Sequence, residues 1–411
     1  MPEATHSTRL KRSITLPLLV AYGVGTMVGA GFYALLGRVA SHAGMHTPIA
    51  FLLAAGVAFV SGLSFSELAS RYPFSAGESR YVQEAFRARW LSILIGWAVI
   101  ATGIVSAATL TRAFVGFLQD LVNVPTTVGI VVFVAGLTLI ATRGILESVW
   151  FTTLITVIEV GGLFWVLGAN GQSWGELPVR WRELVPDASW GSWTGITMAA
   201  FLAFYAFIGF EDMVNEAEEV QQPRVNLPRG IVCALVITSI LYVLVSLAAV
   251  LAFTPAELAE SRTPLALLVS RHGDVAQSAM TYISLLAGIN GSLVQLIMAS
   301  RVAYGMADHG LAPRALATVH PRYQTPIRAT LLISGFILVF ALWLPLEALA
   351  RVTSSIMLLN FAIVNASLVR IKLKTRGQPA EDFKVYPIWI PVLGGALCLL
   401  FLTLQLFTLS A

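Results

Sequence analysis

The sequence predicts an all-α integral membrane protein, and three observations lead to this class: an apolar composition, few charges, and long uncharged runs. Of the 411 residues, 57% are hydrophobic and only 12% are charged, about half the charged share of a soluble domain. A soluble protein of this length could not cover so much apolar surface, because a folded globule still exposes a large shell. The same composition excludes a disordered chain, a coiled coil and a nucleic-acid-binding domain.

Cutting the chain at every Asp, Glu, Lys and Arg locates the predicted spans in order. Ten uncharged stretches each hold roughly the 20 residues that a helix needs to cross a hydrocarbon core: 13–37, 39–66, 90–111, 121–142, 188–210, 230–256, 275–300, 329–346, 352–369 and 385–411. An eleventh stretch, 149–169, is equally apolar and carries one acid, Glu159, near its middle. Helices are expected because barrel strands would be shorter and would alternate. Residues 1–411 therefore form one transmembrane domain of about eleven helices.

Basic residues orient these spans. With the N-terminus inside, 19 of the 26 Lys and Arg fall in inner segments, including Arg9, Lys11 and Arg12 ahead of the first span. The positive-inside rule therefore predicts a multi-pass protein of the inner (plasma) membrane, with a cytoplasmic N-terminus and an outside C-terminus. The first run is too long for a signal peptide and is kept as a span. The two cysteines, Cys233 and Cys398, lie in apolar runs and offer no disulfide framework.

Two spans contain sequences that weaken a helix. Four glycines occur within the nine positions 23–31 of the first span, and each is about 1 kcal/mol less favourable than Ala inside a helix. A shorter interruption at 204–211 falls in the sixth span. Unwound backbone in a bilayer is tolerated only where it faces protein, water or a ligand. The alternative is close helix packing of the Gly-x-x-x-Gly type, such as Gly25 with Gly29.

The placement of these breaks predicts an internal repeat. Gly31-Phe32 and Gly209-Phe210 occupy matching places five spans apart. An odd number of spans per unit gives two successive units opposite membrane orientations, and matched broken helices are typical of transporters with inverted repeats. We expect a first repeat over 13–170, a second over 188–370, and an additional transmembrane helix at 385–411.

Four stretches, in order, resemble the amino-acid permeases of the amino acid–polyamine–organocation superfamily. They are 24–32 with its glycines, 67–86 after the second span, 207–229 at the sixth span, and 300–326 at the end of the eighth. The resemblance covers nearly the whole chain and implies a leucine-transporter-type fold of 5+5 inverted repeats with helices 1 and 6 broken. Members usually have twelve spans, and eleven are expected here.

The resemblance and the chemistry of an amino acid point to the same backbone. An amino acid's carboxylate suits the free N–H groups and positive dipole at the start of a helix, and its ammonium suits unwound carbonyls. The resemblance matches the carboxylate to Gly29, Ala30 and Gly31, and the ammonium to Met27, Tyr205 and Ile208. With Ala206 and Phe207, these residues form the predicted substrate site. The walls of this site are apolar, and residues 204–210 contain no acid. We therefore expect a substrate with a neutral side chain.

Three further residues are candidates for coupling or gating. Glu159 is the only acid deep inside a span, and such groups usually face the bundle interior or an aqueous path. Several proton-coupled relatives place a Lys there, and the lysine mechanism cannot be carried over to a Glu. A buried Glu nevertheless suits a proton carrier, so a coupling role is expected for Glu159; the alternative is a protonated structural acid. Glu211 stands where relatives place an acid of the inner gate. Around Asn290 the paired hydroxyls that bind sodium in this fold are missing, so proton coupling is favoured over sodium.

These features predict a secondary active transporter that takes up neutral amino acids by alternating access with proton coupling. Its expected partners are the amino acid, the proton and the lipid bilayer, with no nucleic acid, cofactor, metal site or catalytic residue. An amino-acid exchanger and a polyamine or amine transporter of the same fold are the near alternatives. A membrane enzyme would need acids, histidines or nucleophile–base sets within the spans, and the spans contain almost none. A channel or a receptor built on this scaffold is a third class, and saturable uptake with counterflow would distinguish a carrier from it. The oligomeric state is not fixed by the sequence.

Overall fold

The computed structural model describes residues 12–73, 77–143, 149–308, 310–375 and 384–410. Three of the residues behind the predicted orientation, Arg9, Lys11 and Arg376, lie outside these ranges, as does residue 411. Within the described ranges the chain is helical, and the only extended pairing is an isolated bridge between Ile14 and Val220. The predicted all-α membrane class is therefore confirmed.

The helices follow the predicted order, with short 3-10 segments between them. The long ones are α3 (Thr47–Arg71), α5 (Arg89–Gln119), α6 (Thr126–Arg143), α7 (Val149–Ala169), α10 (Pro223–Ala252), α13 (Asp274–Asp308), α14 (Ile327–Trp343), α15 (Leu346–Lys374) and α16 (Trp389–Ser410). Two spans are interrupted, giving α1 (Leu16–Met27) with α2 (Ala30–Ala43), and α9 (Trp190–Phe204) with η3 (Tyr205–Phe207) and η4 (Phe210–Glu216). The short helices are α4 (Gly77–Phe86), α8 (Leu177–Leu184), α11 (Pro255–Glu260) and α12 (Pro264–Val269); the remaining 3-10 turns are η1 (Gly44–His46), η2 (Gly171–Glu176), η5 (Ser270–His272) and η6 (Arg314–Ala317).

The described residues include eight helical segments that are long and apolar enough to cross a membrane. A ninth is obtained if the bent pair Thr153–Ala169 and Gly171–Leu184, at 54°, counts as one span. Leu16–Met27 and Ile327–Trp343 are apolar but shorter, at 12 and 17 residues. The count of eleven spans and the two inverted repeats remain predictions.

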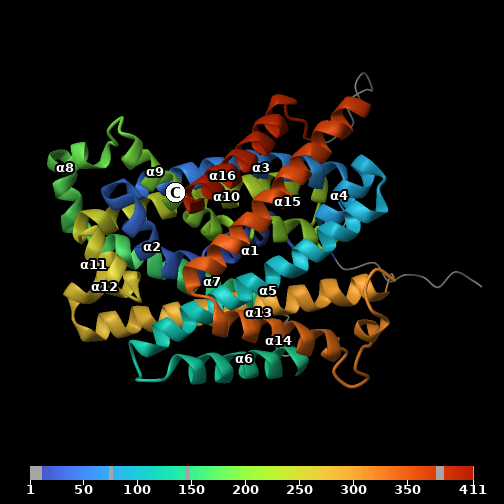
Figure 1. The fold of residues 1–411 in the computed structure, drawn as a ribbon, viewed down its shortest axis with the longest axis horizontal. Coiled ribbons are helices and arrows are strands. Elements are labelled where there is room, and N and C mark those ends of the chain that lie inside the picture. The colour runs from blue at the N-terminus through green and yellow to red at the C-terminus, as the bar shows by residue number, and fades with distance from the viewer. Residues whose placement is uncertain (1–11, 74–76, 144–148, 309, 376–383, 411) are drawn as a thin grey trace, which may run out of the picture.

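The long helices run side by side between two ends of the molecule. In Figure 1, α4 lies at one end of the long axis and α8 and α11 at the other, with α3, α5, α10 and α13 running between them. One apolar core packs α1, α2, α3, α9, α10 and α15 together, and a second joins α5, α6, α13 and α14. Both broken helices belong to the first core, so the boundary between the two cores lies next to the breaks.

Segments expected as loops contain helices that the charge rule could not find. In α4 the buried residues Glu78, Tyr81, Val82 and Ala85 recur at helical spacing, which makes one face of a charged helix apolar enough to dock. Cutting at every charge removes such a helix from the list of spans, although its packing face is regular.

A buried ionic cluster fixes the end of α3 to α15 and to the segment before α16. Glu67 is fully buried, and its carboxylate accepts hydrogen bonds from Arg71 at 2.7 Å, Lys372 at 2.6 Å and the Tyr386 N–H at 2.8 Å. A buried carboxylate is costly unless several donors satisfy it, and here three donors do so. The cluster attaches α16 to the core of the molecule.

Candidate substrate site

The first span breaks between α1 and α2. Helix α1 ends at Met27, Val28 leaves the helical conformation with ψ at 95°, and α2 begins at Ala30 after an extended Gly29. The glycines on either side of the break weaken the helix, so the helix is interrupted between α1 and α2. The first N–H groups of α2 are therefore free of intrahelical partners and point, with the positive end of the helix dipole, at the gap.

The second break follows α9. The chain tightens into η3, Ile208 is extended, and Gly209 adopts φ +129° before η4 begins. A Cβ atom at Gly209 would lie 2.6 Å from the carbonyl oxygen of Thr26. Glycine is required here twice over, because the conformation and the close approach to α1 both exclude a side chain.

The two breaks are held together by hydroxyl groups. Thr26 Oγ1 donates to the Gly209 carbonyl at 3.0 Å. The buried Tyr242 hydroxyl, from α10, donates to the carbonyls of Met27 at 2.7 Å and Ala206 at 3.0 Å. The Tyr242 ring stacks on Phe32 with centroids 4.0 Å apart, which fixes the hydroxyl between the two broken spans.

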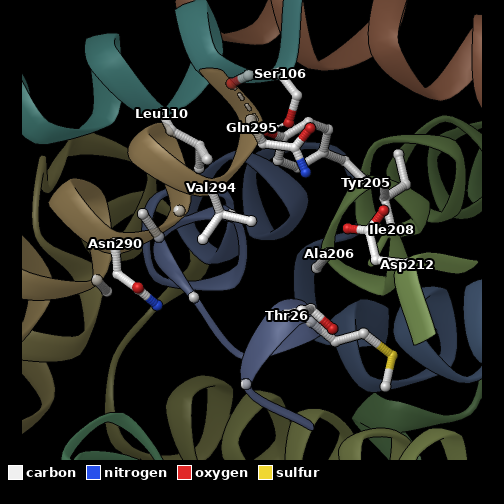
Figure 2. Close-up of a pocket in the computed structure, with 17 residues that line it drawn as sticks. Thr26, Ser106, Leu110, Tyr205, Ala206, Ile208, Asp212, Asn290, Val294 and Gln295 are labelled. Carbon is white, nitrogen blue, oxygen red and sulfur yellow. Dashed lines mark hydrogen bonds between the residues drawn. The ribbon is translucent and has the colours of Figure 1, made fainter. Parts of the chain in front are cut away.

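A cavity lies beside both breaks and is closed by α5 and α13 (Figure 2). It holds about 590 Å³ of empty space, a volume that includes space open to the surroundings. The Tyr205 hydroxyl forms a hydrogen bond with Ser106 at 2.9 Å across one wall. The cavity is lined by Gly25, Thr26, Met27, Gly29, Ala30, Gly31, Ser106, Leu110, Tyr205, Ala206, Ile208, Asp212, Ala287, Asn290, Gly291, Val294 and Gln295.

Most of the predicted site residues meet at this cavity. Those that line it are Met27, Gly29, Ala30, Gly31, Tyr205, Ala206, Ile208 and Asn290. Phe207 lies outside the lining: it is fully buried, and its ring packs edge-on against Tyr242 at 5.2 Å. Glu159 and Glu211 are likewise not among the lining residues.

Glu159 is sealed behind the first break. It is fully buried, and neither carboxyl oxygen has a hydrogen-bond partner among the described residues. Its backbone carbonyl accepts the Tyr33 hydroxyl at 2.6 Å. One turn earlier on α7, Thr156 packs so closely on Gly25 that a Cβ there would be 1.8 Å from its hydroxyl oxygen. The acid therefore sits where α7 contacts the broken span.

Glu211 serves the second break directly. Its Oε2 accepts the Gly209 N–H at 2.8 Å, and the residue is buried. This hydrogen bond satisfies a donor that the unwound backbone would otherwise leave free. Glu211 thus holds the conformation of the break from just beyond the cavity.

Five polar residues that shape the site were missed by sequence reasoning: Thr26, Ser106, Asp212, Tyr242 and Gln295. Thr26 and Asp212 lie within or beside the glycine-containing stretches, so a wider window would have included them. Asp212 matters most, because it places an acid in the cavity wall one residue beyond the interruption taken from the sequence. The other three lie on unbroken helices, where no local pattern distinguishes them.

A second buried acid stands near Asp212. Glu78, in the first turn of α4, is 7% exposed, and neither carboxyl oxygen has a partner in the described part of the chain. Burial, assisted by the charge of Asp212, raises the pKa of Glu78 to about 8. Helix α4 and η4 meet closely here, since a Cβ at Gly77 would be 2.8 Å from the Asn215 side chain.

At the opposite end, α2 is joined to α15. The His42 Nε2 and Glu347 Oε1 atoms are 3.0 Å apart, and Arg351 binds the same carboxylate at 2.6 Å. These three side chains link α2, the second half of the broken span, to the start of a long helix. The cavity is thus flanked by an ionic contact at one end and by buried acids at the other.

The geometry defines a class: a helical membrane protein with two broken helices that face one small-molecule cavity, as secondary transporters have. The sequence profile of the amino acid permease family matches residues 14–411. The chain belongs to this family, and it is a transporter rather than an enzyme.

Relatives across the family agree. An uncharacterized transporter of Mycobacterium tuberculosis is 31% identical over 371 residues, covering 90% of this chain and 82% of the relative. A branched-chain amino acid permease of Bacillus subtilis is 27% identical and covers 97% of this chain and 88% of its own length. A mitochondrial cationic amino acid transporter of Arabidopsis thaliana is 28% identical, with 89% of this chain and 63% of the relative covered.

Proposed function

We propose that this protein takes up neutral amino acids across the plasma membrane by alternating access, in symport with protons. The observation that supports it best is the cavity between the two broken helices, because it offers both kinds of backbone group that an amino acid needs. The free N–H groups at the start of α2 suit the carboxylate, and the carbonyls of the unwound segments suit the ammonium.

The proposal of a neutral substrate rests on the walls. Met27, Leu110, Ile208 and Val294 surround the space that a substrate side chain would fill, and apolar burial there favours an apolar side chain. The branched-chain amino acid permease of Bacillus subtilis, which covers nearly all of this chain, is named for such substrates.

Proton coupling is assigned to Glu159. Its carboxyl is buried without a hydrogen-bond partner among the described residues, behind the break of the first span. Protonation would neutralise it when the carrier turns, and loss of the proton on the other side would favour substrate release.

Alternating access requires that each end open in turn. The contact of His42 with Glu347 must separate before the cavity opens toward α11. Helices α4 and η4 must part for it to open toward the other end, which the sequence predicts to be cytoplasmic. Neither movement needs the long helices α5 and α13 to deform.

The substitution Glu159→Gln tests the coupling, because glutamine imitates the protonated acid permanently. In proteoliposomes this variant should no longer concentrate leucine under an imposed pH gradient, yet leucine exchange should persist, since exchange needs no proton cycle. Accumulation that remains gradient-driven in the variant would remove Glu159 from the mechanism.

A second candidate function is transport of cationic amino acids, and Asp212 in the cavity wall favours it. Relatives in Arabidopsis thaliana are named cationic amino acid transporters. Competition decides between the two: for a neutral carrier, alanine should compete with labelled leucine and arginine should not. Arginine competing as well as alanine would establish the second candidate.

A further inference from the structure

Asp212 and Glu78 have no role in the mechanism proposed above, although both are buried acids beside the cavity. Asp212 lines the cavity on the side of Ile208 (Figure 2), and its Oδ2 atom is shielded from solvent with no hydrogen-bond partner in the part of the chain that the structure describes. Glu78 is equally buried, with both oxygens unpartnered among the described residues. The two are close enough for the charge of one to act on the other.

No base neutralises this pair in the described surroundings. From η4 itself Glu211 and Glu216 add further acids, α1 contributes the Tyr22 hydroxyl, and α4 contributes Tyr81. Arg301 of α13 is a cation near these acids, and its charge acts on Glu216.

Helices α3 and α10 also pack on η4. Gly62 faces Phe210, and Gly230 faces the end of Met213. Two carboxyl groups in such a setting cannot both be ionised at modest cost, because each charge is desolvated and repelled by the other. One proton held between them relieves both penalties.

We infer that Asp212 and Glu78 form a proton-binding site that joins the substrate cavity to the α4 end of the molecule. Asp212 reaches the cavity, and Glu78 stands behind it where α4 meets η4. The site is separate from Glu159, which is sealed on the far side of the first break, and it gives the carrier a second titrating group next to the substrate.

A proton suits this site better than the charged end of a substrate. A lysine or arginine side chain would satisfy Asp212 alone and would leave both oxygens of Glu78 without a donor. A proton on either carboxyl removes one of the two buried charges, and the Oδ2 atom of Asp212 is shielded from solvent.

The first test needs no substrate. Infrared spectra of the purified, substrate-free protein should show a protonated-carboxyl band that is lost between pH 6 and 9. In Glu78→Gln this step should disappear, and in Asp212→Asn it should move down by about one pH unit or more, since the neighbouring charge is gone. Glu84→Gln, on the same helix and paired with Arg80 at its surface, is the matched control and should keep the step.

Glu78→Asp protects the test against a folding defect, because it retains the acid and should retain a titrating band. The inference is overturned if Glu78→Gln and Asp212→Asn both show the wild-type step. It is also overturned if lysine stabilises the wild type against heating, Asp212→Asn abolishes that stabilisation, and Glu78→Gln leaves both it and the titration unchanged. Asp212 would then be a substrate contact.

The second test measures leucine uptake into proteoliposomes at varied internal pH. The wild type and Glu84→Gln should respond to internal pH, and the response should be lost in Glu78→Gln and Asp212→Asn; a full response in both variants would count against the site. Failure of the wild type to transport any amino acid would refute the proposed function, while the infrared step of the substrate-free protein would still stand. The two proposals can therefore fail separately.

Discussion

Gly209 is the residue at which backbone conformation and helix contact impose the same demand. Its φ of +129° disfavours a side chain, and a Cβ would press on the Thr26 carbonyl at 2.6 Å. We expect Gly209→Ala to cost about 1–3 kcal/mol and to abolish leucine uptake, because α1 must shift. Thermal unfolding in detergent measures the first effect, with Gly161→Ala, which has open space around it, as the control. Equal melting temperatures for the two variants would contradict this account.

Gly29 and Gly31 both lie in the segment predicted to bind the substrate carboxylate, and they form a matched pair of positions for substitution. A side chain at Gly31 meets the Tyr205 ring at 2.9 Å, whereas Gly29 is extended and has nothing within 4 Å of a Cβ. Gly31→Val should therefore eliminate uptake while the protein still inserts in the membrane, and Gly29→Ala should leave thermal stability within about 0.5 kcal/mol. Leucine uptake and membrane abundance check the Gly31→Val variant, and thermal unfolding checks Gly29→Ala; normal uptake by Gly31→Val would exclude the predicted carboxylate site.

Individual residues show which parts of the site could be predicted from the sequence. The glycines marked the two unwound segments, which is a local property; the family resemblance then selected Met27, Gly31 and Ile208 within them, and these residues line the cavity, while their roles in binding stay predictions. Ser106 and Gln295 were not found, because their roles arise only when α5 and α13 pack against the breaks. Phe207 lies in the right segment, yet its side chain turns to Tyr242, and rotamer direction is not encoded in spacing.

Among the elements, the contact of α2 with α15 is the clearest candidate for a closure. Glu347→Gln removes the charge that both His42 and Arg351 bind, so the end toward α11 should open more often. We expect a faster reaction of Asn290→Cys, in a background without Cys233 and Cys398, with an impermeant thiol reagent. The His46→Gln change, nearby but outside this contact, should leave the rate as it was. An unchanged rate in Glu347→Gln would mean that the contact does not control access.

Elements were predicted well where hydrophobic length alone defines them. The predicted stretch 149–169 coincides with α7, and the breaks in the first and sixth spans were located to within a few residues. Helix α4 was missed because its charges interrupt the apolar run, although its buried face recurs regularly. The second span was placed too early, since α2 continues to Ala43 before α3 begins at Thr47. Where no charged residue separates two consecutive helices, cutting the sequence at charges cannot locate the turn between them.

The whole molecule should become less stable as the pH rises. The pKa of Glu78 is about 8 in the folded state against an ordinary 4.5, so the folded state holds a proton that the unfolded state gives up. This contribution is complete below about pH 4.5 and is lost as the pH passes through 8, with each pKa unit corresponding to about 1.4 kcal/mol. The melting temperature in detergent should fall from pH 6 to 9, and Glu78→Gln should flatten the decline. An identical decline in that variant would assign it to other groups.

Tyr242 has one hydrogen to donate and two carbonyls, of Met27 and Ala206, that accept it. At any instant one of these two carbonyls is therefore without this donor. A substrate ammonium brings three donors and ends the competition. In the proposed carrier a bound amino acid would therefore add a further link between the two broken spans, beside the links made by Tyr242 and by the Thr26 hydroxyl with the Gly209 carbonyl.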